Sequence, residues 1–224
     1  MIKTIIILLY LLSRCSVLLA QESYALKEQV NDTKPTELPY VSIMRSPFVV
    51  RNLPSEERQN LPMYVYNELR GIDKVKEKYC AIFRYFNSTN GSYKIFLIAL
   101  GEYLNFRKLL VAYDLSYKMV SWIEVEYGFD PFYNVMQWRL NKDMTVETYN
   151  IKILGDKRVE IYDNPFKELK AQRIDAFYKI DSLGHFQKQK EIFYVPRMYQ
   201  RSYFEGKNRP IWEGDEEVKE TKEY

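Results

Sequence analysis

From residue 79 onward, apolar and polar residues alternate in short runs that are separated by turn-forming segments. A two-residue period places successive side chains on opposite faces, which is the pattern of a half-buried β-strand. Twenty tyrosines and twelve phenylalanines against eight glycines add the aromatic residues that pleated surfaces favour. We predict strands at residues 79–86, 93–100, 107–113, 118–126, 135–140, 145–154, 157–162, 172–180 and 186–195.

The links between these predicted strands are short and rich in Asp, Asn, Ser and Gly. They read "NSTNGS", "DLSYK", "NKDM", "GDK" and "DSLG". A crossover between parallel strands needs a dozen or more residues, so links of this length join antiparallel neighbours. The sequence therefore predicts a mainly β chain, an antiparallel meander that forms a sandwich or a barrel-like domain with little helix.

Three of the predicted hairpins share one pattern: a strand, an Asp or Asn, a few turn residues and a second strand. The segments are "VAYDLSYKMVSWI", "QWRLNKDMTVETY" and "FYKIDSLGHFQKQ". Asp and Asn side chains accept hydrogen bonds from the backbone just ahead of them, and this holds a turn in place. The uneven spacing between the copies argues against a regular repeat array or a propeller.

Composition divides the chain into four parts. Residues 1–20 have the plan of a signal peptide. Residues 21–62 carry five prolines with little periodicity, which indicates an extended tether and an edge segment, with a first edge strand near residues 48–53. Residues 63–212 form the predicted all-β domain. Residues 213–224 are mostly charged with an excess of acids, and we predict a flexible acidic tail there.

The first twenty residues, "MIKTIIILLYLLSRCSVLLA", combine a cationic start with an apolar run too short to span a bilayer. Cleavage after Ala20 would export the chain to the periplasm or to the surface of a Gram-negative bacterium. In an alternative interpretation, Cys15 becomes acylated as in a lipoprotein, but Arg14 replaces the small residue that such processing requires. No later segment is apolar for long enough to be a transmembrane helix.

Charge and residue counts exclude several classes of function. Without Lys3 and Arg14, 31 basic residues face 30 acidic ones, and this balance argues against nucleic acid as a partner. Cys80 is then the sole cysteine and His185 the sole histidine, so the usual ligands of a zinc site are missing. Because no catalytic or cofactor motif is present either, we predict a protein without enzymatic activity, metal or cofactor.

One pair of acids nevertheless suggests a glycan hydrolase as an alternative. Glu124 and Glu126 alternate with Val125, which would place both carboxylates on one face of a strand, and Asp130 follows shortly after. Two carboxylates that flank a sugar are the machinery of glycosidases. The simpler interpretation is that this is a solvated strand face.

The densest aromatic segment is "EYGFDPFYNVMQW", residues 126–138. Trp138 shares a strand face with Met136 and Leu140, so we predict it in the core. The remaining residues lie at a predicted corner, either as a hydrophobic plug over an open end of the sheets or as a shallow ligand-binding platform. The candidate ligand-binding residues are Tyr127, Phe132 and Tyr133 for stacking, with Asp130 and Asn134 as hydrogen-bond partners.

A second notable segment is "KQKEIFYVPRMYQRSYFEGKNRPIW", residues 188–212, in which basic and aromatic residues are interleaved. Such a surface can bind an anionic polymer. The alternative, which we favour, is a final pair of strands whose charged outer edge discourages aggregation.

The leader that ends in Ala20-Gln21, the "YKID" turn at 178–181 and the tyrosine-rich hairpins resemble uncharacterised exported all-β proteins of Gram-negative gut bacteria. This resemblance implies an envelope location and no activity. The leading hypothesis is a non-enzymatic envelope protein that binds a glycan or a surface protein. The alternatives are the glycan hydrolase and a structural or inhibitory partner that docks by strand addition.

Overall fold

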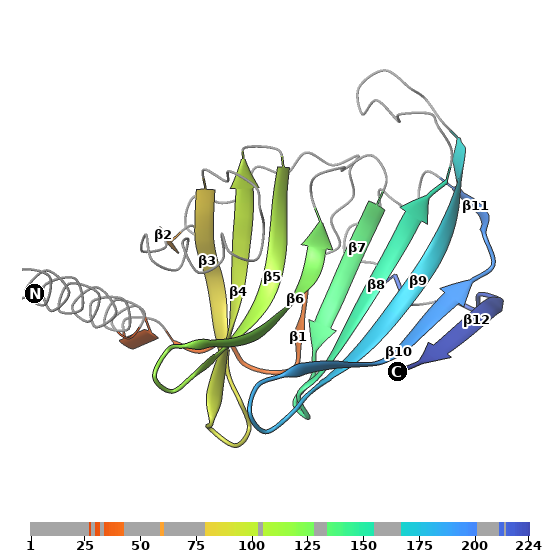
Figure 1. The fold of residues 1–224 in the computed structure, drawn as a ribbon. Coiled ribbons are helices and arrows are strands. Elements are labelled where there is room, and N and C mark those ends of the chain that lie inside the picture. The colour runs from red at the N-terminus through yellow and green to blue at the C-terminus, as the bar shows by residue number, and fades with distance from the viewer. Residues whose placement is uncertain are drawn as a thin grey trace, which may run out of the picture.

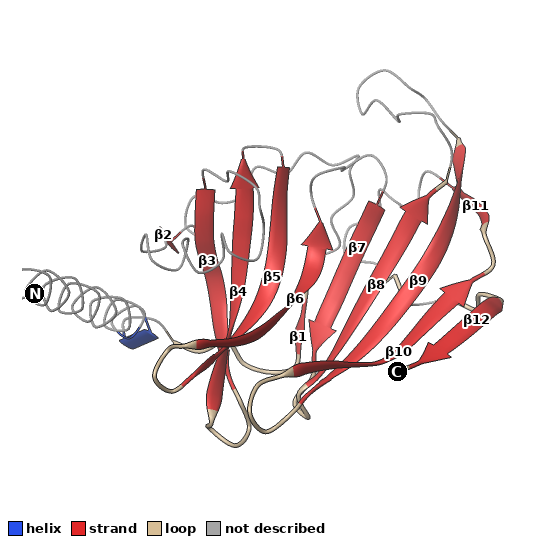
Figure 2. Cartoon of the chain, in the orientation of Figure 1, coloured by secondary structure: helices blue, strands red, loops and turns tan. Residues whose placement is uncertain are grey.

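The structure is a computed structural model, and it describes residues 27, 30–31, 34–42, 59–60, 79–102, 105–127, 134–154, 167–200, 211–212 and 214–224. Within these residues the chain is almost entirely β-structure (Figures 1 and 2). The strands are β1 (Tyr40–Val41), β2 (Gln59–Asn60), β3 (Tyr79–Asn87), β4 (Tyr93–Glu102), β5 (Asn105–Asp114), β6 (Met119–Tyr127), β7 (Asn134–Leu140), β8 (Thr145–Ile153), β9 (Glu168–Ile180), β10 (Phe186–Tyr194), β11 (Arg197–Gln200) and β12 (Val218–Glu223). The predicted mainly β class is confirmed.

The described strands form two antiparallel sheets. Sheet A has the order β1-β7-β8-β9-β10-β12, with β11 paired to β9 beyond the end of β10, and sheet B has the order β2-β3-β4-β5-β6. Short hairpins join β3 to β4, β4 to β5, β5 to β6, β7 to β8 and β9 to β10, so these neighbours are antiparallel, as the short links predicted. Both sheets are open at their edges, so the packing is that of a sandwich and not of a closed barrel (Figure 1).

The main hydrophobic core lies between the two sheets. Alternate residues of β3, β4, β5 and β6 face alternate residues of β7, β8 and β9, as the two-residue period requires. Trp138 is fully buried there, which confirms its predicted core position, and its ring lies 5.1 Å from that of Tyr40. The buried members of this core are Phe86, Tyr93, Ile95, Leu97, Leu110, Ala112, Val125, Trp138, Leu140, Met144, Val146 and Ile180.

Each sheet also buries apolar residues on its other face. On sheet B, a cluster around Phe96 and Tyr113 packs against residues that include Val30. On sheet A, a cluster around Tyr149 and Ile151 is completed by Ile211 and the partly buried Trp212. The C-terminal segment therefore covers part of the outer face of sheet A, the face that points away from sheet B.

Four hairpin turns lie at one end of the molecule and share one backbone design (Figure 1). In each turn the fourth residue has a positive φ and donates its backbone N–H to the carbonyl oxygen of the first. The donor–acceptor pairs are Gly91 to Ser88 at 3.1 Å, Tyr117 to Asp114 at 3.0 Å, Met144 to Asn141 at 3.1 Å and Gly184 to Asp181 at 3.2 Å. The three related hairpins in the sequence thus adopt related turns, and the hairpin between β3 and β4 adds a fourth.

A side-chain oxygen holds each of these turns, but it comes from two different positions. Asp114 and Asp181 are the first residues of their turns, and their side chains accept backbone hydrogen bonds. In the other two turns the accepting side chain belongs to the third residue, Asn90 or Asp143. Asn141, which the pattern predicted as a cap, instead donates its amide to side chains of β8. The nearest backbone donors are Ser116 to Asp114 at 2.9 Å, Leu183 to Asp181 at 2.9 Å, Ser92 to Asn90 at 3.1 Å and Thr145 to Asp143 at 3.1 Å.

A flexible acidic tail was predicted at residues 213–224, but in its described part, residues 214–224, β12 pairs with β10. The register places Lys222 opposite Glu191 and Glu223 opposite Lys190, so charges that look like a solvated tail in the sequence are complementary across the strand pair. The signal peptide, the predicted edge strand near residues 48–53 and the predicted strand at 157–162 lie outside the described residues.

Gly184 is the turn residue with the tightest surroundings, and we expect Gly184→Ala to lower the free energy of unfolding by about 2–4 kcal/mol. Its φ is +97°, and an added Cβ would lie 3.3 Å from Cγ of Tyr93 and 3.4 Å from Cβ of Ala112. Gly91→Ala is the matched control, since Gly91 has a φ of +69° and no atom within 4 Å of such a Cβ. We expect it to cost about 1 kcal/mol. Urea unfolding measures both, and equal losses would contradict the packing argument.

The turn carboxylates should make the fold sensitive to acid. The Thr145 hydroxyl, followed by the backbone N–H of that residue, holds the pKa of Asp143 below its ordinary value of 3.8 despite some burial. Asp114 also has a lowered pKa, because hydrogen bonds from its turn outweigh burial. A lowered pKa in the folded state gives stability that is present above the unfolded value and is lost as the pH falls through the folded one.

We therefore expect the free energy of unfolding to decrease below about pH 4, and Asp143→Asn to lose less of it between pH 5 and pH 3. The asparagine keeps an oxygen acceptor for Thr145 but has no charge to titrate. Urea unfolding at several pH values measures this, with Asp215→Asn at an exposed position as the control. Parallel acid profiles for the unmodified protein and Asp143→Asn would contradict the prediction.

Candidate functional site

The structure places the ends of the predicted aromatic platform but not its centre. Tyr127 is the last residue of β6 and Asn134 is the first of β7. Asp130, Phe132 and Tyr133 lie outside the described residues. The choice between a hydrophobic plug and a ligand-binding platform at this corner therefore stays a prediction.

The two strand acids are described, and the predicted common face is wrong. A β-bulge in β6 places Glu124 opposite Leu109 and Glu126 opposite Lys108, and these two partners are adjacent on β5. Adjacent strand residues point to opposite faces, so the two carboxylates do as well. Glu124 forms an ion pair with Arg107 at one face.

Glu126 is buried on the other face, between the sheets. Its carboxylate lies 2.8 Å from Nζ of Lys108 and accepts a 3.0 Å hydrogen bond from the indole N–H of Trp138. Lys108 comes from sheet B and Trp138 from sheet A, so this acid joins the two sheets. Two acids that point to opposite faces cannot flank one sugar ring, and the paired-carboxylate arrangement of a glycosidase is not formed by Glu124 and Glu126.

The described residues gather a different group of polar side chains on the outer face of sheet A. Alternation along β8 and β9, together with the register that pairs Tyr149 with Asp175, brings Arg, Tyr and acidic residues to one face. We call this group the arginine–tyrosine cluster. Its members are Arg139, Glu147, Tyr149, Arg173, Asp175, Tyr194, Arg197 and Tyr199.

Arg173 and Asp175 form the centre of this cluster. The guanidinium donates two hydrogen bonds to the carboxylate, from Nε at 2.8 Å and from Nη2 at 2.7 Å, and both residues are almost fully buried. The Tyr194 hydroxyl donates a third bond at 3.0 Å, and its ring lies 4.6 Å from the guanidinium carbon. Burial raises the pKa of Asp175 although these bonds oppose the shift, and burial with the nearby carboxylate raises the pKa of Tyr194 to about 12.

Glu147 organises the side of the cluster nearest β7. Its carboxylate accepts a hydrogen bond from Nη2 of Arg139 at 2.7 Å and a very short one from the Tyr149 hydroxyl. Burial, together with that bond, raises the pKa of Tyr149. Trp212 covers this side, with its ring 4.8 Å from that of Tyr149 and 5.4 Å from the guanidinium carbon of Arg139.

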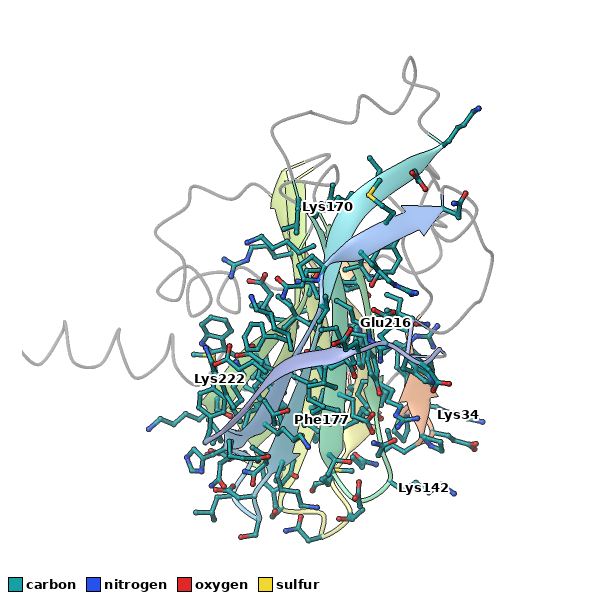
Figure 3. The ribbon with its side chains drawn as sticks, turned by 90° about the vertical axis from the view of Figure 1, so that its right-hand side faces the viewer. Lys34, Lys142, Lys170, Phe177, Glu216 and Lys222 are labelled. Carbon is teal, nitrogen blue, oxygen red and sulfur yellow. The ribbon has the colours of Figure 1, made fainter. Side chains whose placement is uncertain are left out.

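Glu216 supplies the acid on the side of the cluster nearest β11. Arg197 donates to one carboxylate oxygen at 2.9 Å and the Tyr199 hydroxyl to the other at 2.6 Å, while Nη1 of Arg173 lies 3.8 Å away. Only 2% of the Glu216 side chain is exposed, although the residue belongs to a charged terminal segment. Figure 3 shows the segment from Glu216 to Lys222 crossing in front of the sheet.

The neighbouring edge of sheet A is occupied by β12. Among the described strands, β12 pairs with β10 alone, and all six of its residues are exposed. The strand pair is extended by a bond from the N–H of Val195 to the carbonyl of Glu217 at 2.8 Å, and by one from Tyr224 to Gln189 at 3.1 Å.

No known family model matches this chain, and no curated protein or solved structure matches it either. The site must therefore be judged on its geometry. Within the described ranges no group of three or more His, Cys, Asp or Glu side chains could hold a metal ion. In the same part of the chain, no helix is long and apolar enough to cross a membrane.

The basic and aromatic segment at residues 188–212 has its described cations next to acids. Lys188 lies 2.8 Å from Glu191, and Arg197 pairs with Glu216. For these described cations the arrangement agrees with the interpretation of a charged strand pair, because the neighbouring acids offset their positive charge.

Sequence reasoning did not predict this site, although a local signal for part of it was present. The alternation in "AQRIDAF" at 171–177 was sufficient to put Arg173 and Asp175 on one strand face. Glu216 gave no such signal, because it lies in an acidic stretch that has no apolar period. Its role depends on a long-range contact with β9 and β11 that no local pattern encodes.

The central ion pair gives a stability test. We expect Asp175→Ala to lower the free energy of unfolding by about 3–5 kcal/mol, because it leaves the Arg173 guanidinium buried without its main partner. Glu223→Ala removes the exposed partner of Lys190, 3.9 Å away, and should cost less than about 1 kcal/mol. Urea unfolding compares the two variants. A loss below about 1 kcal/mol for Asp175→Ala would show that the cluster does not hold sheet A together.

Proposed function

We propose that this protein is a non-enzymatic, exported binding module of the cell envelope that docks an extended segment of a surface protein by strand addition to β10. The observation that carries the proposal is the strand pair of β10 and β12, in which the chain's own terminal segment is bound in this way. In strand addition, backbone hydrogen bonds provide affinity and side-chain contacts provide specificity. The signal peptide predicted at residues 1–20 supports the envelope location.

The backbone bonds between β10 and β12 can be assigned residue by residue. In an antiparallel pair, hydrogen-bonded and non-hydrogen-bonded residues alternate. Because Tyr224 donates to Gln189, the same register makes Lys222 a hydrogen-bonded partner of Glu191 and leaves the N–H of Thr221 directed away from β10. A partner segment would use this same alternation.

Side chains hold β12 only at the surface. Lys190 and Glu223 are 3.9 Å apart with 40% and 70% of their side chains exposed, and such a pair contributes about 0–1 kcal/mol. The Tyr224 hydroxyl donates to Glu191 at 2.9 Å, also in an exposed position. An edge strand with so little buried surface can be replaced by another strand without exposing the core.

The other functions considered have less support. The glycan-hydrolase alternative depended on Glu124, Glu126 or Asp130; the first two lie on opposite faces, and Asp130 lies outside the described residues. A glycan platform would depend on Asp130, Phe132 and Tyr133, which lie outside the described residues. Strand addition is the alternative for which described residues supply the geometry.

The test uses the full chain with Lys222→Pro, which removes a backbone donor from β12 and loosens that strand. We expect a fluorescent peptide that copies residues 214–224 to bind this variant saturably in an anisotropy titration. Binding to the unmodified protein should be at least tenfold weaker, because β12 occupies the edge at a high effective concentration. Circular dichroism verifies that the variant stays folded.

Two further peptides separate strand addition from charge attraction. A peptide with proline in place of Lys222 should lose binding, since it cannot donate to Glu191. A peptide with proline in place of Thr221 should retain more of it, because that N–H does not face β10. Equal binding of all three peptides would contradict strand addition, as would the absence of any binding to the Lys222→Pro protein.

A further inference from the structure

We propose that Arg173, Arg197 and Tyr199 form a carboxylate receptor that takes an acidic residue of the partner's segment in place of Glu216. This inference rests on the proposed strand addition and specifies the ligand that the site selects. The starting observation is that an acid from a surface segment is 98% buried, with three donor groups around it. A buried carboxylate needs such partners, and the partners in turn need an acid.

Within the cluster, Glu216 offsets the positive charge of Arg197. Arg139 and Arg173 have the intrinsic acids Glu147 and Asp175 on the same sheet, each at 2.7 Å. For Arg197 the described acid is Glu216, and it arrives from outside the sheet. When this segment leaves, the cluster loses the negative charge that Glu216 places beside Arg197 and the Tyr199 hydroxyl.

The geometry favours a carboxylate over a more highly charged anion. Arg197 and Tyr199 each bind a different oxygen of Glu216, at 2.9 and 2.6 Å, which matches the two oxygens of a carboxylate. Two donor groups of Arg173 already face Asp175, whose negative charge would repel a second charge on the ligand. The side chain of Arg197 is 45% exposed, so an incoming acid reaches it from solvent.

The position of the receptor defines the recognised sequence. Glu216 precedes the first residue of β12, Val218, by two positions. A matching partner therefore carries Asp or Glu two residues before a strand, followed by residues that suit the charges of β10. In the present register these are a basic residue opposite Glu191 and an acidic residue opposite Lys190.

The occupant that we infer is an acidic segment of a different protein and not of a second copy. Each copy already holds its own segment in place, tethered at high effective concentration. An identical segment from a second copy offers no additional contact with which to displace it. A different protein can add contacts outside the strand and so shift the exchange.

The experiment compares two labelled peptides on the full chain carrying both Lys222→Pro and Glu216→Gln. One peptide copies residues 214–224 and the other has glutamine in place of Glu216. We expect the first to bind about ten- to hundredfold more tightly, because a hydrogen bond to a charged group is stronger than one to a neutral amide. Adding Arg197→Gln to the protein should reduce this ratio to near one.

Lys190→Gln is the matched control, since Lys190 faces β12 at an exposed position away from the receptor. It should weaken both peptides alike and leave their ratio unchanged. Equal binding of the two peptides to the parent protein would overturn the receptor while strand addition stands. An absence of binding by both would overturn the two proposals together. A concentration-dependent dimer of the unmodified protein in gel filtration that is lost with Glu216→Gln would assign the receptor to a second copy and overturn the choice of partner.

Discussion

The buried face between the two sheets is the constraint on which the rest of the structure depends. Trp138 packs at its centre and also donates its indole N–H to Glu126 of the opposite sheet, where Lys108 neutralises the acid. Apolar packing alone tolerates small shifts between sheets, whereas a buried hydrogen bond and ion pair fix one relative position. Once β6 and β7 are fixed in this way, the outer face of sheet A has a defined shape, and the arginine–tyrosine cluster has a rigid base.

The four related turns lie at one end of the molecule, and one of them also helps to hold the two sheets together. Their positive-φ residues allow the strands to reverse tightly, and the turn from Asp181 to His185 contacts its neighbours through backbone carbonyls. Ser121 of β6 donates to the carbonyl of Gly184 at 2.7 Å and accepts from the N–H of Phe186 at 3.1 Å. Local turn chemistry is thereby linked to the contact between the sheets, because these bonds connect β6 of one sheet with the β9–β10 hairpin of the other.

The sequence allowed the fold to be predicted where a signal was local. Alternation located β3 to β10 closely, and Asp or Asn marked the hairpin turns, because strand period and turn capping both act within a few residues. Prediction from the sequence failed where a contact was long-range. The bulge that separates Glu124 from Glu126 depends on pairing with β5, and the burial of Glu216 depends on Arg197 and Tyr199. A charged tail and a charged edge strand have the same composition, so only the register with β10 distinguishes them.

The charged residues at the edge of sheet A protect β10 from uncontrolled pairing, and they also bear on the proposed strand addition. An exposed edge of β10 would invite uncontrolled pairing, and a short strand with alternating Lys and Glu covers it without adding apolar surface. The features that make β12 a safe cover, exposed side chains and few apolar contacts, are also those that the proposed replacement by a partner strand requires. In the proposed exchange, an acid at the position of Glu216 would add the selectivity that backbone pairing lacks, because it binds Arg197 and Tyr199 together. Under the proposed function, the module would stay closed to most extended segments and would open to those that carry an acid two residues before a strand.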